Sequence, residues 1–133
     1  MAEETYKPVP TLIELPHKCA VVAVRDDEEG FRVVLQPEDG GDFYRISFPV
    51  VLFYRKSREG ERLKSLETLV NTSSQKAILH AVEDSRLAKW FDQENLELKG
   101  YSGVTGCPHW AIVTQNDWID VLSYTAPLVE RLA

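Results

Sequence analysis

Residues 19–54 read CAVVAVRDDEEGFRVVLQPEDGGDFYRISFPVVLFY, and this stretch decides the expected fold. Three runs rich in β-branched and aromatic residues are separated by DDEEG and PEDGG, whose glycines and acidic residues are typical of hairpin turns. Pro49 cannot donate a hydrogen bond to a neighbouring strand, so we expect a bend there before the apolar run continues. The stretch therefore predicts an antiparallel meander of about four strands.

Beyond the meander, the apolar residues change to helical spacing, which predicts two or three helices packed on one face of the sheet. The first follows a repeat of leucines over 63–69, and the second an apolar run over 77–82 behind a capping-box pattern. The third begins after a cap at Asp84 or Ser85. Trp90 lies in the apolar stripe of this third helix and is expected in the core.

The C-terminal part begins with a glycine-rich loop over 99–108, followed by HWAIVT, which predicts a strand over 109–114. Residues 118–124, WIDVLSY, fit either a hairpin partner of that strand or a helix, and we favour the hairpin. The last residues, TAPLVERLA, predict a short helix with Thr125 as its cap and Pro127 in its first turn.

These patterns together predict one α+β domain. Residues 1–10 hold two prolines and no periodicity, which indicates a flexible N-terminal lead-in. Residues 11–133 are expected to form the domain: the meander, the helices on one face, then a C-terminal strand or hairpin and a short helix.

Composition narrows the class of protein. The 133 residues contain 21 acidic and 15 basic side chains, a net charge of −6 that repels nucleic-acid backbones and makes nucleic acid an unfavoured partner. No uninterrupted apolar run approaches the roughly 18 residues that span a bilayer, so we expect no membrane partner. The two cysteines are too few for a disulfide scaffold, and the N-terminus does not resemble a signal peptide, so we expect a cytoplasmic protein with reduced thiols.

The leading functional hypothesis is a small acidic module that binds a more basic protein, for example an inhibitor or immunity-type protein. Carboxylates concentrated on a hairpin turn favour docking of a basic surface, and tryptophans on a hairpin are typical of binding hot spots. The residues predicted to bind are Asp26, Asp27, Glu28, Glu29, Trp110 and Trp118.

An alternative is a metal-supported domain or small enzyme built on cysteine and histidine. Cys107 and His109 are two residues apart and share one face of a strand, and His17 and Cys19 repeat that spacing. If the two strands were neighbours, four zinc ligands would converge. In an enzyme, Cys107 and His109 would form a nucleophile pair, with Asp117 or Asp120 orienting His109. A one-residue gap is a weak metal signal, however, and the expectation is that both cysteines are buried packing residues.

A third hypothesis is binding of an anion or nucleic acid through residues 55–64. This run contains the basic residues Arg55, Lys56, Arg58, Arg62 and Lys64. Phosphate-cradling glycine loops, nucleophile elbows and dinucleotide fingerprints are absent from the sequence. The sequence therefore favours binding over catalysis, and it indicates no catalytic residue, metal or cofactor.

Overall fold

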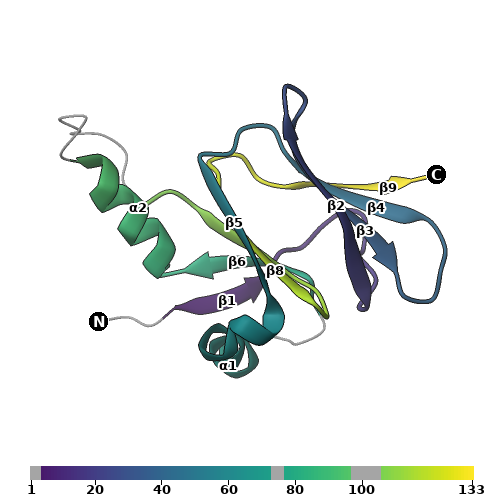
Figure 1. Ribbon diagram of the computed structural model, residues 1–133, viewed down its shortest axis with the longest axis horizontal. Coiled ribbons are helices and arrows are strands. Elements are labelled where there is room, and N and C mark those ends of the chain that lie inside the picture. Colours follow the sequence, from purple (N-terminus) through teal and green to yellow (C-terminus); the bar gives the residue numbers. More distant parts are fainter. Residues whose placement is uncertain (1–3, 73–76, 97–105) are drawn as a thin grey trace.

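The computed structural model of the chain describes residues 4–72, 77–96 and 106–133 (Figure 1). Within these ranges the protein is mostly β, with nine strands and two α-helices. The strands are β1 (Thr5–Pro8), β2 (Cys19–Asp27), β3 (Gly30–Pro37), β4 (Phe43–Phe48), β5 (Phe53–Arg58), β6 (Leu79–Glu83), β7 (His109–Val113), β8 (Asp117–Leu122) and β9 (Leu128–Leu132). The helices are α1 (Leu63–Thr72), which follows a 3₁₀ turn at Glu59–Glu61, and α2 (Arg86–Leu96).

The strands form two antiparallel sheets. One has the order β2-β3-β4-β9, so the predicted meander is present as three consecutive strands and the chain returns at its end to add a fourth. The other has the order β1-β6-β7-β8-β5. The bend expected at Pro49 falls between the two, because β4 ends at Phe48 in one sheet and β5 begins at Phe53 in the other.

The main hydrophobic core lies between the two sheets, since it combines buried side chains of both. In β8, Ile119 and Val121 point into this core, whereas Trp118, Asp120 and Leu122 alternate onto the opposite face of the sheet. The buried members of the core are Cys19, Phe31, Val33, Leu35, Ile46, Phe48, Ile78, Leu79, Ile112, Ile119, Val121 and Val129.

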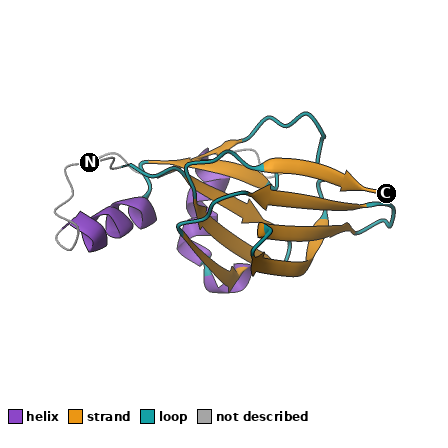
Figure 2. Ribbon diagram, turned by 90° about the horizontal axis from the view of Figure 1, so that it is seen from above, coloured by secondary structure: helices purple, strands orange, loops and turns teal. Residues whose placement is uncertain are grey.

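Both helices pack on the outer face of the five-stranded sheet. Leu69 of α1 joins a cluster with Tyr6 and Trp118, and Leu87 of α2 joins another with Leu122. Figure 1 places the helices on the side away from β2, β3 and β4, and Figure 2 shows them toward the end opposite the C-terminus. The order of layers is therefore four-stranded sheet, five-stranded sheet and helices, with the outer face of β8 beneath the helices.

The predicted α+β class, a meander followed by helices on one of its faces, is wrong, because the described chain is mostly β and its two short helices pack on the five-stranded sheet instead of the meander. The second predicted helix, over 77–82, is instead β6, and the predicted C-terminal helix is β9. Because β6 is covered on one face by the other sheet and on the opposite face by helices, its apolar residues lose the alternation that marks a strand. β9 is an edge strand in which Val129 is buried and Glu130 pairs with Arg45 of β4. Its five residues are too few for the sequence to distinguish the alternation of a strand from the spacing of a helix.

Other segments agree with the sequence or extend it. The favoured hairpin is confirmed as β7 and β8, and α1 and α2 lie where the first and third helices were predicted. Ser85 caps α2, because its hydroxyl oxygen accepts the backbone N–H of Ala88 at 2.9 Å. Residues 5–8, within the segment expected to be a flexible lead-in, form β1 and pair with β6. No helix in the described part of the chain is long and apolar enough to cross a membrane.

Candidate anion-binding site

A buried carboxylate lies at the centre of the outer face of the five-stranded sheet. Asp120 has no exposed surface, and the register of β5 and β8 places Arg55 directly opposite it. Oδ2 of Asp120 accepts hydrogen bonds from Arg55 Nε at 2.9 Å and from Arg62 Nη1 at 2.7 Å. Oδ1 accepts from His109 Nε2 at 2.7 Å and from the indole N–H of Trp118 at 3.2 Å. Both oxygens of this buried charge are therefore satisfied by well-placed donors.

His109 is fixed between two partners. Its Nε2 faces Asp120, and its Nδ1 lies 2.6 Å from the hydroxyl of Ser85. With the proton on Nε2, the imidazole donates to Asp120 and accepts the Ser85 O–H, while Ser85 accepts the N–H of Ala88. In this tautomer every polar atom of the chain Ser85, His109 and Asp120 has a partner.

The three residue types of a Ser-His-Asp triad thus lie in contact, but the arrangement is that of a structural network. In a catalytic triad the carboxylate holds Nδ1 and the serine faces Nε2, whereas here the two ring nitrogens are exchanged. Ser85 is 6% exposed, caps a helix and is not among the residues that line the neighbouring pocket. Its hydroxyl is therefore poorly placed to attack a substrate.

The electrostatics of Asp120 follow from its partners. Burial alone would raise the pKa of this carboxyl, but the hydrogen bond from His109, followed by the hydrogen bond from Arg55 and the charge of Arg62, outweighs burial and holds the pKa well below its usual range. Asp120 is ionised at all ordinary pH values and anchors two guanidinium groups.

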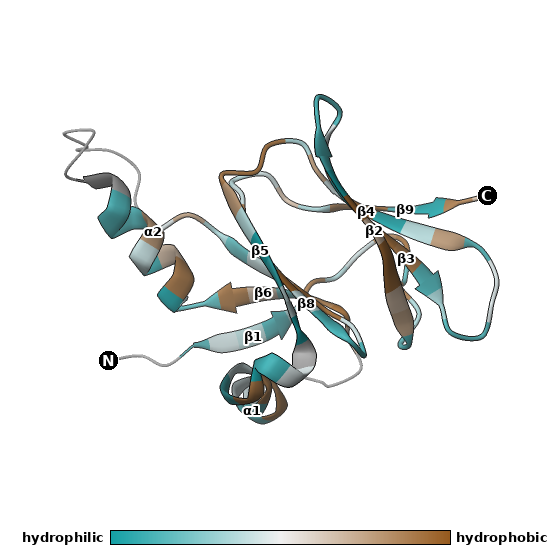
Figure 3. Ribbon diagram, viewed as in Figure 1, coloured by the Kyte–Doolittle hydropathy of each residue, from teal (hydrophilic) through white to brown (hydrophobic). Residues whose placement is uncertain are grey.

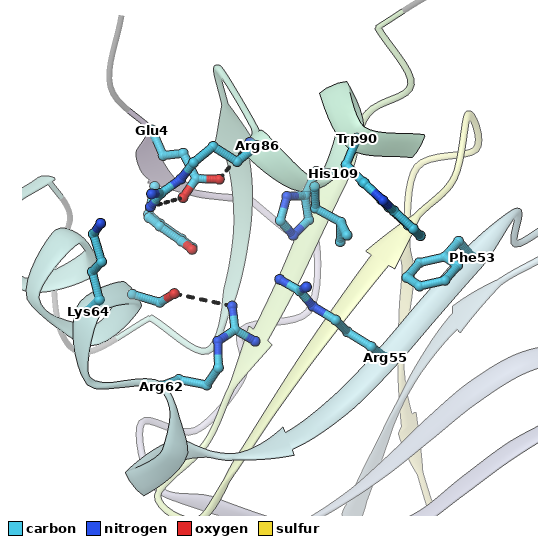
Figure 4. A pocket seen from close by; sticks show the side chains of 11 residues that line it. Glu4, Phe53, Arg55, Arg62, Lys64, Arg86, Trp90 and His109 are labelled. Atoms are coloured by element: carbon cyan, nitrogen blue, oxygen red, sulfur yellow. Dashed lines mark hydrogen bonds and ion pairs between the residues drawn. The ribbon is translucent and has the colours of Figure 1, made fainter. Parts of the chain in front are cut away.

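A pocket of about 500 Å³ opens on this face between α1 and α2 (Figure 4). Its size lies within the range of small-molecule binding sites. Among the described residues that line it, four are cationic and one, Glu4, is acidic. The complete lining is Glu4, Tyr6, Phe53, Arg55, Arg62, Lys64, Ser65, Arg86, Leu87, Trp90 and His109.

The four cations differ in how much of their hydrogen-bonding capacity is already used. Arg62 is 15% exposed and donates hydrogen bonds to Asp120, Ser57 and Ser65, so its donors serve the structure of the protein and not a ligand. Arg55 is 46% exposed and binds Asp120 through Nε, which leaves its two terminal nitrogens without a partner in the described chain. Lys64 is exposed and has no acidic partner among the described residues. Arg55 and Lys64 therefore offer donors to the pocket.

Arg86 faces the pocket from the first turn of α2, where it meets Glu4. The Glu4 carboxylate accepts the backbone N–H of Arg86 at 2.8 Å and its Nη2 at 3.2 Å. Glu4 thereby occupies the N-terminus of α2, where unpaired N–H groups favour negative charge. Arg86 is 58% exposed and keeps its other terminal nitrogen for the pocket.

The structure brings part of the predicted basic run into the site. Arg55, Arg62 and Lys64 line the pocket, whereas Lys56 is not among the lining residues and pairs with Asp117 at 3.0 Å. Arg58, at the end of β5, is likewise not among them. Alternation along β5 explains the division, because Arg55 shares the outer face with Asp120 and Lys56 does not.

The proposed cysteine and histidine site is not assembled. Cys19 belongs to the core between the sheets, whereas Cys107 packs under α2 on the other face of the five-stranded sheet. Burial, with a smaller contribution from Asp39 or Asp92 respectively, raises the pKa of each thiol to about 11. Among the described residues, no three potential ligands gather as a metal site. Of the residues suggested to orient His109, Asp120 does contact it.

The residues predicted to bind a protein lie in different environments. Asp26, Asp27, Glu28 and Glu29 are exposed at the hydrophilic tip of the β2–β3 hairpin (Figure 3), where Arg32 bonds to both Asp27 and Glu29. Trp118 has no exposed surface, and Trp110 is partly buried with its indole N–H bonded to Ser123 O at 3.0 Å. Docking of a basic partner on the acidic turn stays a prediction.

Sequence reasoning missed the pocket residues Glu4, Tyr6, Arg86 and the exposed ring of Trp90. Arg86 and Trp90 are four residues apart and share one face of α2, a spacing visible in the sequence. Trp90 was expected in the core, yet it is 46% exposed and lines the pocket. No signal in the sequence places Glu4 or Tyr6 beside these residues.

Comparison with known proteins adds no functional assignment, since no protein-family model, curated protein or solved structure matches the chain.

Proposed function

We propose that the protein binds a small anionic ligand in the cationic pocket. The observation that carries this proposal is the convergence of Arg55, Lys64 and Arg86 on one pocket, each with at least one donor group unused by the described chain. They come from β5, α1 and α2, so the fold gathers these charges from three separate elements.

The buried carboxylate supports this function by fixing the cationic groups in advance. Asp120 binds Arg55 and Arg62 from the sheet side of the pocket and restricts both side chains before a ligand arrives. This restriction reduces the conformational entropy that the arginines would lose on binding. Because Asp120 can offset only one of these two positive charges, an excess of positive potential faces the pocket. This local excess is opposite in sign to the net charge of −6 of the whole chain.

Binding fits the site better than catalysis does. His109 is 1% exposed and both of its ring nitrogens are engaged, so it has no free atom with which to exchange a proton with a ligand. The Tyr6 hydroxyl is also an unsuitable base, because burial, reinforced by Glu4 and Asp120, raises the pKa of this phenol far above its usual value.

Titration calorimetry with inorganic phosphate at low ionic strength tests the proposal. We expect saturable binding that weakens as salt is added, because the pocket is open to solvent and screening acts on its charges. Lys64→Ala should weaken phosphate binding by roughly 3- to 10-fold, the loss expected for one charge-assisted contact at a partly exposed site.

Lys56→Ala is the matched control. It removes the same charge from the same basic run, but Lys56 is not among the pocket-lining residues. Equal weakening by the two variants would assign binding to general charge attraction and contradict a pocket site. Failure of the wild-type protein to bind phosphate would contradict the proposed function itself.

A further inference from the structure

The pocket has two chemically different ends. Phe53, Leu87 and Trp90 form an apolar wall, and Lys64 belongs to the cationic side. Figure 4 shows Trp90 and Phe53 together at one side of the pocket and Lys64 at the opposite side, with Arg55 between them. A ligand that fills the pocket therefore meets an apolar surface and a positive one at the same time.

The apolar end is built around an exposed aromatic ring. Trp90 is 46% exposed, although it belongs to a helix whose neighbouring residues Leu87 and Ala88 are buried. Its ring meets Phe53 edge to face, with centroids 5.4 Å apart and an interplanar angle of 65°. Because Phe53 supports one part of the indole, the rest of the ring is held in a defined orientation toward the pocket.

The cationic end suits a phosphate better than a carboxylate. A carboxylate is matched by the parallel N–H groups of a single guanidinium, whereas a phosphate presents three acceptor oxygens in different directions. Arg55, Lys64 and Arg86 reach the pocket from three separate elements, so they approach a ligand from different sides. Such an arrangement accommodates a tetrahedral anion.

We infer that the ligand of this pocket joins an aromatic ring to a phosphate, as a nucleoside monophosphate does, with the ring stacked on Trp90 and the phosphate held by Arg55, Lys64 and Arg86. This inference rests on the proposed anion-binding function and specifies the ligand that the site selects. The ring position follows from the exposed indole, and the phosphate position follows from the unused donors.

Calorimetric titration of the whole chain with adenosine monophosphate, inorganic phosphate and adenosine tests the inference. We expect adenosine monophosphate to bind about 5- to 150-fold more tightly than inorganic phosphate, the gain expected from stacking one base on an aromatic side chain. Adenosine, which lacks the phosphate, should bind more weakly than the monophosphate. Saturation with the monophosphate should also change the fluorescence of Trp90.

Variants of Trp90 separate the contribution that the aromatic ring of the ligand makes to affinity from that of its phosphate. Trp90→Ala should reduce the affinity for adenosine monophosphate by a much larger factor than the affinity for inorganic phosphate. Trp90→Phe should restore most of the difference, because it replaces one aromatic surface by another. Leu63→Ala is the control, since Leu63 is an exposed apolar residue of α1 that does not line the pocket.

Two results would overturn the inference while the proposed function stands. One is equal affinity for phosphate and adenosine monophosphate in the wild-type protein. The other is a preference for the monophosphate that survives Trp90→Ala. If neither compound binds, the anion-binding function is itself wrong, so the two failures are distinguishable.

Discussion

Two arginine–carboxylate clusters in the described part of the chain join three residues each, and their carboxylates differ in burial. Around Asp120, Arg55 and Arg62 approach a carboxylate with no exposed surface. At the tip of the β2–β3 hairpin, Arg32 meets Asp27 and Glu29, whose side chains are 52% and 78% exposed. Both clusters have short contacts, so geometry alone does not distinguish their roles.

Burial determines how much each cluster contributes to the stability of the fold. At the hairpin tip, water solvates the carboxylates whether or not Arg32 is present, so each pair adds little to stability. Around Asp120, removing the carboxylate or a guanidinium leaves the opposite charge buried without its partner. The contributions of these residues to stability are therefore coupled. Each exposed carboxylate of the hairpin cluster can therefore be replaced at little cost, because Arg32 keeps the other one, whereas Asp120 fixes the positions of the pocket residues.

The largest expected effect tests this difference directly. Asp120→Ala should lower the free energy of unfolding by about 3–5 kcal/mol, because Arg62 is left buried without its counter-charge. Asp27→Ala is the matched variant and should cost less, about 1–2 kcal/mol, because Arg32, itself only 12% exposed, keeps Glu29 as a partner while the turn loses the acceptor of the Glu29 N–H. Urea denaturation of the two variants at pH 7 measures both values, and similar losses would refute the contrast.

Low pH should reduce the loss of unfolding free energy that Asp120→Ala causes. The pKa of Asp120 is held below its unfolded value of about 3.9, so the ionised carboxylate contributes its full stabilisation above about pH 4. This contribution falls as the pH drops toward the pKa of the folded state. The difference in unfolding free energy between wild type and Asp120→Ala should thus be smaller at pH 2 than at pH 7. A constant difference from pH 7 to pH 2 would mean that Asp120 does not stabilise the fold as a carboxylate.

The Glu4–Arg86 pair is intermediate, with Glu4 8% and Arg86 58% exposed. Glu4→Gln keeps an oxygen that can accept the Arg86 N–H but removes a negative charge from the pocket lining. Phosphate binding should therefore tighten by about 2- to 5-fold, a gain typical of one partly screened charge. Calorimetry measures the change, and Glu83→Gln is the control because Glu83 pairs with Lys7 outside the pocket lining. Unchanged or weaker binding in Glu4→Gln would argue against an anion at this position.

The smallest effect is expected at the exposed cluster. Glu29→Ala should change the free energy of unfolding by less than about 0.5 kcal/mol, because the side chain is mostly solvated and Arg32 keeps Asp27. Added salt at about 0.5 M should reduce even this difference. A loss above 1 kcal/mol in urea denaturation would show that exposure does not predict the energetic weight of these clusters.

The sequence predicted those parts of the fold in which local pattern and environment agree. The β2-β3-β4 meander has one buried face, so apolar and polar residues alternate, and Gly30 adopts a positive φ in the turn between the first two strands. The failure at β6 has the opposite cause, because that strand is buried on both faces and resembles any short apolar run. At β9, pairing with Arg45 and Ile46 of β4 decides the structure, and no local signal reveals a partner more than 80 residues away.

The candidate site was predictable only where its residues are close in the sequence. The basic run supplied Arg55, Arg62 and Lys64, but its pattern did not reveal that Lys56 lies on the other face of the strand. Asp120 was suggested as a partner of His109, whereas its role as anchor of two arginines depends on the pairing of β5 with β8. Glu4 and Arg86 are 82 residues apart, so their contact follows from the topology of the sheet and not from a motif.

The order of strands in the five-stranded sheet has a consequence for folding. β5 pairs with β8, and β4 pairs with β9, so both sheets need segments from the last 17 residues of the chain. On the ribosome, Arg55 and Arg62 emerge long before Asp120, and during that interval they cannot adopt their native positions. Non-local pairings of this kind are associated with slow folding. We therefore expect the ability to bind an anion to develop late in refolding, together with the closure of β8, whereas the local β2–β3 hairpin can form early.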